Sequence, residues 1–152
     1  MTIVTVADPR QPEVESLVRA SDAYAESLYA TGACSSLALA ELVADGVTVF
    51  VARDAEGLAL GMAALVNRGD GTGELKRLFV SEAGRGQGVA TAVMDALEAA
   101  ARAASTHTLQ LETGPRHLAA IALYEQRGYV HIERFGPYAG NGFSVCMEKT
   151  LG

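Results

Sequence analysis

The sequence predicts a mixed α/β domain. Two apolar stretches, 47–53 and 58–66, have the composition of buried β-strands and are separated by a short turn. Two other segments, 12–30 and 89–104, carry apolar residues at the three- and four-residue spacing of amphipathic helices. Residues 74–80 have the pattern of a strand that continues through a glycine-rich turn into the helix 89–104. The predicted elements follow the order β-α-α-β-β-β-α-β-α-β-β, which requires a crossover helix between neighbouring strands.

The N-terminal part predicts one strand and two helices. Residues Thr2–Val6 alternate apolar and polar side chains and stop at an Asp-Pro pair, which predicts a short strand. The following helix has Pro12 near its start and ends near Ala30, where Thr-Gly follows. A second helix is expected from Ser35 to Ala44, closed by Asp-Gly.

The middle of the chain predicts three strands in succession. Val47–Arg53 and Leu58–Val66 are joined by the loop 54–57, which ends in glycine as hairpin loops often do. The loop 67–73 contains three glycines and precedes the third strand, Glu74–Val80.

The turn after that strand has the layout of an anion-binding site. Gly86 and Gly88 lack the Cβ atoms that would keep a ligand away from the backbone, and Arg85 adds a cation. The first amides of a helix have no intrahelical partner, and the helix dipole places partial positive charge beside them. Phosphate oxygens are suited to such a position. The spacing excludes a dinucleotide fingerprint, because the sixth position is Val89 or Thr91 rather than glycine.

The C-terminal part predicts a strand, a helix and a final strand pair. Thr106–Glu112 alternates leucines with polar residues. A helix follows from Leu118 to Arg127, where Gly128 ends it. Strands at 129–134 and 143–149 are separated by the loop FGPYAGNG at 135–142.

The composition indicates a single globular domain and argues against nucleic-acid-binding and membrane-spanning proteins. With 152 residues, 49% of them apolar, the chain suits one domain over residues 1–152. A net charge of −6 with only 12 scattered Lys and Arg argues against a nucleic-acid surface. No apolar run reaches the roughly 20 residues of a membrane span, and the N-terminus lacks a signal-peptide pattern, so a cytoplasmic protein is expected.

The cysteines and histidines predict no metal centre. Cys34 and Cys146 are too few for a disulfide framework or a tetrahedral metal set, and three histidines are scattered in the second half of the chain. Both thiols are expected to be buried as small apolar side chains.

Two motifs make the chain resemble the GNAT superfamily of acetyl-CoA-dependent N-acetyltransferases. The first is RGQGVA at 85–90, in the strand-turn-helix setting of the family's acetyl-CoA signature. The second is AAIALYEQRGY at 119–129, a helix that ends in tyrosine, a polar run, glycine and an aromatic residue. The resemblance covers most of the chain from Val47 onward. It implies a mainly antiparallel sheet of six to seven strands, flanked by about four helices, with a splayed central strand.

The resemblance also implies a set of residues that bind acetyl-CoA as co-substrate. The backbone of the central strand would pair with the pantetheine amides, and the amides of the glycine turn would hold the diphosphate. His117 stands where many relatives carry an asparagine that contacts the pantetheine arm. The expected binding residues are Leu78, Phe79, Val80, Arg85, Gly86, Gln87, Gly88, Val89, Ala90, Thr91 and His117.

Direct transfer to an amine requires a base and a group that stabilises the leaving thiolate. Glu74, eleven residues before Arg85, matches the position of the general base in one branch of the family, and Glu112 or a water chain is the alternative. Tyr124 matches the family's tyrosine near the CoA sulfur. A backbone amide near Leu78 or Phe79 would stabilise the oxyanion.

The acceptor is expected to be a primary amine of a small molecule. A pocket walled by the first two helices, the loop near Asn67-Arg68 and the loop 135–142 would hold it. The candidate contacts are Tyr24, Tyr29, Glu112 and Tyr138. A protein or peptide amine, and a non-catalytic acyl-CoA sensor, are the alternatives. No metal, nucleic acid or membrane partner is implied, and homodimerisation is left open.

Overall fold

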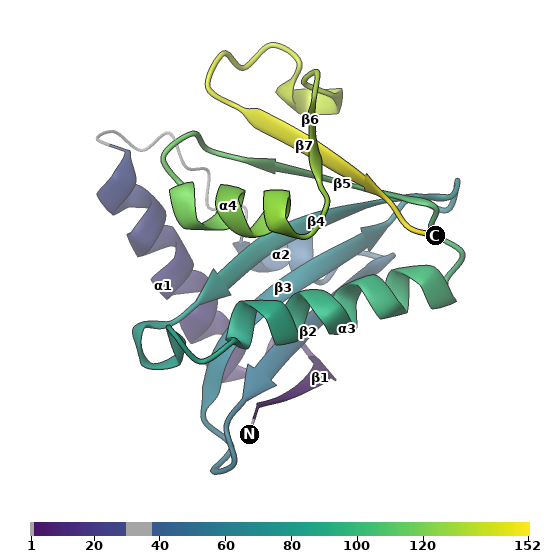
Figure 1. Ribbon diagram of the computed structural model, residues 1–152. Helices are drawn as coiled ribbons and strands as arrows, with labels where there is room; N and C mark the ends of the chain where they lie inside the picture. The colour runs from purple at the N-terminus through teal and green to yellow at the C-terminus, as the bar shows by residue number, and fades with distance from the viewer. Residues whose placement is uncertain (1, 30–37) are drawn as a thin grey trace.

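A seven-stranded sheet runs through the molecule in the order β1-β2-β3-β4-β5-β7-β6 (Figure 1). The computed structural model describes residues 2–29 and 38–152. The strands are β1 (Ile3–Ala7), β2 (Val47–Arg53), β3 (Ala59–Asn67), β4 (Thr72–Val80), β5 (Thr108–Thr113), β6 (Val130–Ile132) and β7 (Val145–Thr150). The helices are α1 (Pro12–Leu28), α2 (Ala38–Leu42), α3 (Val89–Ala103) and α4 (Leu118–Gln126), with short 3-10 helices η1 (Glu82–Gly84) and η2 (Gly136–Tyr138).

The sheet is mixed and mainly antiparallel. Each described pair of neighbouring strands is antiparallel except β4 and β5, which run parallel. A parallel pair needs a crossover, and α3 supplies it. The last strand, β7, lies between β5 and β6. The predicted fold class is therefore confirmed.

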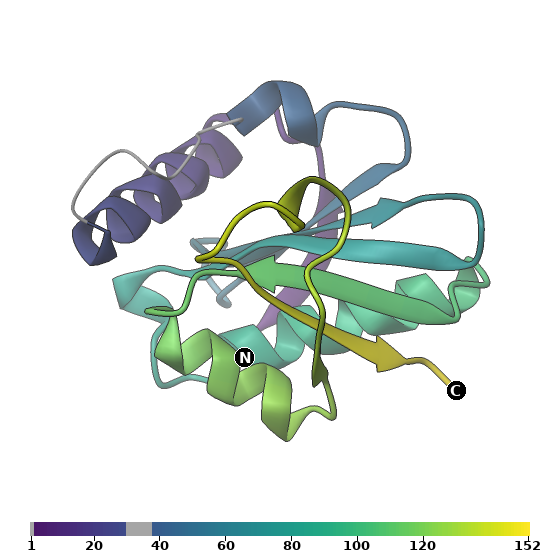
Figure 2. The ribbon, with the colours of Figure 1, turned by 90° about the horizontal axis from the view of Figure 1, so that it is seen from above.

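Helices cover both faces of the sheet (Figure 2). On one face, α1 and α2 pack on a core that includes Val18 and Leu42. On the other, α3 and α4 pack on a core that includes Leu97 and Tyr124. β2 contributes to both cores because successive side chains of a strand point to opposite faces, which explains its continuous apolar run.

A β-bulge interrupts β4 beside β3. Phe79 pairs with Met62 and Lys76 pairs with Ala64, so the two residues Arg77 and Leu78 oppose one residue of β3. Arg77 has φ of 60°, a left-handed conformation that non-glycine residues rarely adopt. The extra residue reverses the alternation of side chains. Leu75 therefore packs on the α3 core, whereas Phe79 packs on the α1 core.

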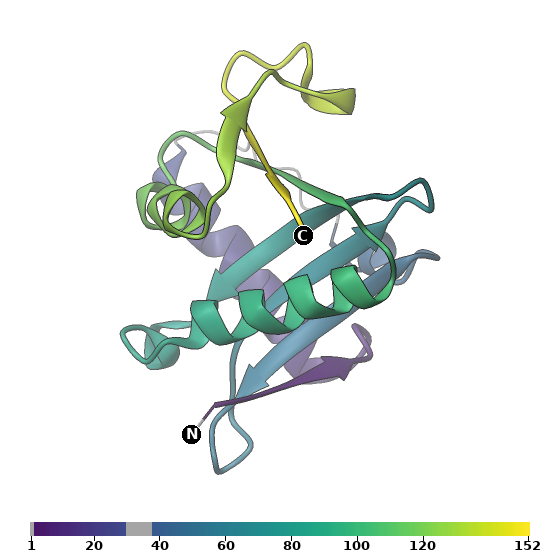
Figure 3. The ribbon, with the colours of Figure 1, turned by 45° about the vertical axis from the view of Figure 1, so that its right-hand side comes forward.

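β4 and β5 diverge after Leu75, just before the bulge (Figures 1 and 3). Their pairing runs from Thr72 to Leu75 on β4, opposite Thr108 to Leu111 on β5. Within the described residues, the rest of β4 has no strand beside it on that side. The splayed central strand implied by the family resemblance is present, and the opening lies between the ends of two parallel strands.

Several element bounds differ from the predictions. β6 is three residues long and not six, because the chain turns away from β7 after Ile132. β4 begins at Thr72, so the preceding loop is shorter than predicted. The expected N-terminal end of the second helix, near Ser35, lies outside the described residues. None of the helices in 2–29 and 38–152 combines the length and apolar character needed to cross a bilayer.

Candidate active site

The glycine turn places the N-terminus of α3 at the open end of β4. Gly86 and Gly88 have φ of 76° and 74°, and Gly88 is the N-cap residue of α3. A side chain at either position would be strained by this backbone conformation. It would also project into open space, since a Cβ built there meets no atom within 4 Å. The turn thus leaves room for a ligand directly against the backbone amides.

A groove runs from this turn along β4. We call it the cofactor groove. It is lined by Ser21, Tyr24, Leu78, Phe79, Val80, Gly84, Arg85, Gly86, Gly88, Val89, Ala90, Thr91, His117, Ala119, Ala120 and Leu123. All the residues predicted to bind acetyl-CoA are among them, except Gln87. The Gln87 side chain instead donates a hydrogen bond to the carbonyl oxygen of Ala83, with Nε2 and O 2.6 Å apart.

Tyr24 belongs to the cofactor groove. Its ring lies 6.3 Å from that of Phe79, and the guanidinium of Arg85 lies 5.4 Å above it. Tyr24 was a candidate contact for the acceptor. The structure places it beside the cationic start of the glycine turn, where it holds Arg85 by a cation–π contact.

A second cavity of about 610 Å³ adjoins the groove. We call it the acceptor cavity. It is lined by Ser21, Asp22, Ala25, Tyr29, Leu75, Arg77, Leu78, Glu112, Thr113, Gly114, Pro115, Arg116, His117, Ala120, Tyr124, Tyr138, Asn141 and Phe143. It shares Ser21, Leu78, His117 and Ala120 with the groove. The junction of the two spaces therefore lies at the bulge in β4.

The walls of the acceptor cavity agree in part with the prediction. Helix α1 and the loop 135–142 contribute, as expected. Among the described residues, α2 and Asn67-Arg68 are not part of the lining. Residues 113–117, which form the end of β5 and the turn before α4, line the cavity instead, because β5 ends beside the splayed part of β4.

Tyr124, on the last turn of α4, lines the acceptor cavity. Only 4% of the residue is exposed, and its ring packs 5.7 Å from that of Tyr129. No hydrogen bond to its hydroxyl is found within the described part of the chain, and the residue lines the cavity. Burial raises the pKa of Tyr124 well above its usual value, so the hydroxyl keeps its proton at neutral pH.

Glu112 lies near the end of β5 and faces the acceptor cavity. Its Oε2 accepts a hydrogen bond of 2.6 Å from the hydroxyl of Ser144. Burial raises the pKa of Glu112, partly offset by the hydrogen bond from Ser144, and the nearby charge of Glu74 raises it further. This carboxylate therefore holds a proton more readily than a solvated glutamate.

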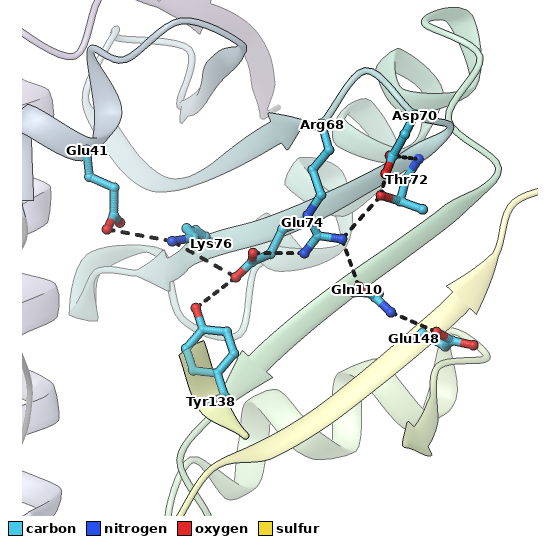
Figure 4. A network of polar contacts seen from close by, with 9 residues as sticks. All are labelled: Glu41, Arg68, Asp70, Thr72, Glu74, Lys76, Gln110, Tyr138 and Glu148. Atoms are coloured by element: carbon cyan, nitrogen blue, oxygen red, sulfur yellow. Dashed lines mark hydrogen bonds and ion pairs between the residues drawn. The ribbon is translucent and has the colours of Figure 1, made fainter. Parts of the chain in front are cut away.

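Glu74 is buried on β4, with 8% of the residue exposed. Oε1 accepts a hydrogen bond of 3.0 Å from Nη2 of Arg68, and Oε2 accepts one of 2.8 Å from the hydroxyl of Tyr138 (Figure 4). Among the described residues that line the acceptor cavity, Glu112 and Tyr138 are present and Glu74 is not.

His117 forms the wall between the two spaces, immediately before α4. Its Nδ1 lies 3.0 Å from the hydroxyl of Tyr29, and its ring packs against Tyr24 and Tyr29. Burial lowers the pKa of His117, so the ring is neutral at neutral pH. His117, which was expected beside the pantetheine arm, lies in the lining of the cofactor groove.

Charged residues that the sequence did not single out also line the acceptor cavity. Arg77, on the bulge, donates a hydrogen bond of 2.6 Å to Asp22 of α1. Arg116 donates one of 2.7 Å to the carbonyl oxygen of Leu28, at the end of the same helix. Both bonds join α1 to segments more than 50 residues away in sequence, so no local pattern could have indicated them.

Cys146 is buried as predicted, whereas Cys34 lies outside the described residues.

This arrangement defines a class of enzyme. A splayed parallel strand pair, a bulge and a glycine turn at a helix N-terminus form a groove that suits acyl-CoA, and the groove adjoins a second cavity for an acceptor. Residues 14–129 match the model of the Acetyltransferase (GNAT) family. The chain belongs to this family, and it is an acyltransferase.

Individual relatives agree with this assignment. The chain is 35% identical to an IAA acetyltransferase of Azospirillum brasilense over 154 residues, which covers 99% of this chain and all of the relative. A solved structure from Klebsiella pneumoniae, assigned as an acyl-CoA N-acyltransferase, is 38% identical with a TM-score of 0.88 and covers 100% of this chain and 99% of its own. A GNAT acetyltransferase of Staphylococcus aureus, 14% identical with a TM-score of 0.79, shares the fold over 99% of this chain and 100% of its own.

Proposed function

We propose that the protein transfers the acetyl group of acetyl-CoA directly to a primary amine of a small molecule. One observation carries the proposal: the cofactor groove and the acceptor cavity meet at Leu78 and His117, with Tyr124 and Glu112 on the acceptor side of the junction. The relative from Azospirillum brasilense is named an acetyltransferase of IAA, which supports a small-molecule acceptor.

Several groups of the cofactor groove support the proposed binding of acetyl-CoA. Amides at the start of α3, from about Gly86 to Thr91, would hold the diphosphate, and Arg85 adds a positive charge near it. The free side of β4 at Leu78 and Val80 would pair with the pantetheine amides as a short added strand. Bound acetyl-CoA supplies an activated acetyl group, a thioester carbonyl next to a good leaving group.

Glu112 is the proposed base of the reaction. An amine attacks only when it is neutral, and free alkylamines are largely protonated at neutral pH. Glu112 takes one proton from the ammonium group, a role that its position in the cavity and its raised pKa both favour. The neutral nitrogen then attacks the thioester carbon, and the C–N bond forms as the carbonyl oxygen becomes an oxyanion near the backbone of Leu78 or Phe79.

Tyr124 is proposed to stabilise the leaving sulfur. As the C–S bond breaks, the hydroxyl of Tyr124 donates a hydrogen bond to the sulfur and accepts one from the nitrogen. The second nitrogen proton passes along this path, so CoA leaves as the thiol. Overall one proton, held by Glu112, is released to water. Because its own pKa is high, Tyr124 remains protonated before and after each turnover.

The test is a panel of acceptors with purified protein. We expect thiol release from acetyl-CoA with small primary amines, and a matching acetylated product by mass spectrometry. If the protein acetylates only peptide amines, the proposed acceptor changes from a small molecule to a protein or peptide. Tight binding of acetyl-CoA, measured by calorimetry, without turnover on any amine would identify a sensor and overturn the proposal. A parallel series with propionyl- and butyryl-CoA tests whether acetyl is the preferred group.

A further inference from the structure

Two carboxylates on neighbouring strands hold the same loop. Residues 135–144, which we call the acceptor loop, lie in the connection between β6 and β7 and contribute Tyr138, Asn141 and Phe143 to the acceptor cavity. Glu74 of β4 accepts a 2.8 Å hydrogen bond from Tyr138, and Glu112 of β5 accepts a 2.6 Å bond from Ser144. The loop is thus tied to the sheet near both of its ends.

Both oxygens of Glu74 are already engaged (Figure 4). Oε1 is bonded to Arg68 at 3.0 Å and Oε2 to Tyr138 at 2.8 Å, with Nζ of Lys76 4.0 Å from Oε2. Two cations thus face this carboxylate. A general base must also lie within reach of the proton that it removes, and Glu74 is not among the described residues that line the acceptor cavity. Glu112 has one described hydrogen-bond donor, Ser144, and it faces the cavity.

Arg68 connects Glu74 to the start of the acceptor loop. Besides its bond to Glu74, its guanidinium lies 5.4 Å above the ring of Phe135. The Phe135 ring meets that of Tyr138 edge to face, with centroids 5.3 Å apart. Arg68 is itself fixed by a 2.8 Å bond to Gln110, which in turn donates to Glu148 at 3.1 Å (Figure 4). The network therefore fixes η2 relative to three strands of the sheet.

We infer that Glu74 is a positioning residue, which holds Tyr138 and the acceptor loop in the conformation that binds the amine. This inference rests on the proposed function, in which Glu112 takes the proton. In some relatives the corresponding position carries a catalytic base. In this chain we assign Glu74 a role in substrate recognition instead. Tyr138 then acts as a wall of the cavity whose orientation is set from behind by the buried carboxylate.

The first test separates acceptor affinity from turnover. Tyr138→Phe removes the bond to Glu74 and leaves the Glu74–Arg68 pair in place. We expect the KM for the amine to rise roughly tenfold, as for the loss of one charge-assisted hydrogen bond, with little change in kcat or in the KM for acetyl-CoA. Tyr129→Phe is the matched control. Its hydroxyl also donates to a buried glutamate, Glu98, at 2.8 Å, but away from the cavity. It should leave the KM for the amine unchanged.

The second test is the pH profile of kcat/KM for the amine. We call the fall of kcat/KM at low pH, which reports protonation of the base, the acidic limb. Glu74→Gln should keep the acidic limb, whereas Glu112→Gln should remove it. The limb should move to lower pH in Glu74→Gln, because the charge of Glu74 raises the pKa of Glu112. Other titratable groups near Glu112 are Lys76, Tyr138 and Cys146. Loss of the limb in Glu74→Gln, together with its retention in Glu112→Gln, would make Glu74 the base and overturn the inference.

A third measurement does not depend on turnover. Hydrogen exchange of the amides in residues 135–144 should accelerate in Tyr138→Phe and Glu74→Gln, and stay at the wild-type rate in Tyr129→Phe. If the wild-type protein acetylates no amine, the proposed function fails, and the exchange data still decide whether Glu74 holds the loop. Unchanged exchange in both variants would contradict the positioning role.

Discussion

The hydroxyl of Tyr29 lies 3.0 Å from Nδ1 of His117 and joins the end of α1 to the start of α4. The same hydroxyl accepts a 3.0 Å hydrogen bond from the backbone N–H of Arg116. Tyr29 and Arg116 line the acceptor cavity, and His117 lines both the cavity and the cofactor groove. One tyrosine therefore links the end of α1 to the start of α4 beside the acceptor cavity.

Tyr29→Phe should loosen this link. The substitution leaves Nδ1 of His117 and the amide of Arg116 without their described partner, which should lower the free energy of unfolding by about 1 kcal/mol. Because His117 lines both spaces, the KM should rise for the amine and for acetyl-CoA. Denaturant unfolding and steady-state kinetics provide the two measurements. A variant with wild-type KM values for both substrates would show that the contact does not shape the site.

Gly88→Ala should impair binding of acetyl-CoA. A residue other than glycine at φ of 74° is strained by about 1 to 2 kcal/mol, and the added methyl group projects into the groove where the diphosphate would lie. We expect the Kd for CoA, measured by calorimetry, to rise at least tenfold. Gly57→Ala is the control. Gly57 has φ of 88° and open space around it, but it lies in the loop between β2 and β3. Equal loss of CoA affinity in the two variants would point to general destabilisation.

Most of the fold could be predicted from the sequence, because its signals are local. The apolar strands, the two long helices and the glycine turn each depend on residues within one element. The bulge at Arg77 could not be predicted in this way. It is a mismatch between two strands, and an arginine, not a glycine, occupies the left-handed position. The splay that opens the groove begins next to this bulge and was expected only from the family resemblance.

The polar network of the site was the least predictable part. The spacing of Glu74 from Arg85 suggested a base, but Tyr138, its partner, lies 64 residues later in the chain. Glu98 is one of the polar residues between the apolar positions of the helix 89–104, yet only 2% of it is exposed. Its partners come from other elements, so the periodicity of one helix could not show that it is buried.

Tyr124→Phe should slow the chemical step and spare binding. The substitution removes only the hydroxyl, and the buried ring retains its packing against Tyr129. We expect kcat to fall roughly 100-fold, the lower part of the range for proton-transfer groups, while the Kd for CoA stays near wild type. Rapid-mixing measurements of a single turnover should show the same decrease. If kcat is unchanged, the leaving sulfur needs no hydroxyl, and Tyr124 is only a core residue.

The buried carboxylate of Glu98 joins α3 to the end of α4 and to β7. It accepts hydrogen bonds from Nε and Nη2 of Arg127 at 3.2 and 3.1 Å, from the hydroxyl of Tyr129 at 2.8 Å and from Nζ of Lys149 at 2.9 Å. Burial alone would raise the pKa of Glu98. The bonds from Arg127, Lys149 and Tyr129 outweigh burial, so its pKa lies below the ordinary value of 4.5.

Glu98→Gln should therefore destabilise the protein in a pH-dependent way. The variant leaves Arg127 and Lys149 without their buried counter-charge, which should lower the free energy of unfolding by about 3 kcal/mol at pH 7. Because the folded pKa is below the unfolded one, the contribution of Glu98 is complete above the unfolded pKa and is lost as the pH falls through the folded pKa. The difference between wild type and variant should shrink on acidification. Glu13→Gln, which alters a surface pair with Arg53, is the control and should have a much smaller effect. A Glu98→Gln penalty that is constant from pH 7 to acid would show that packing, not charge, explains the loss.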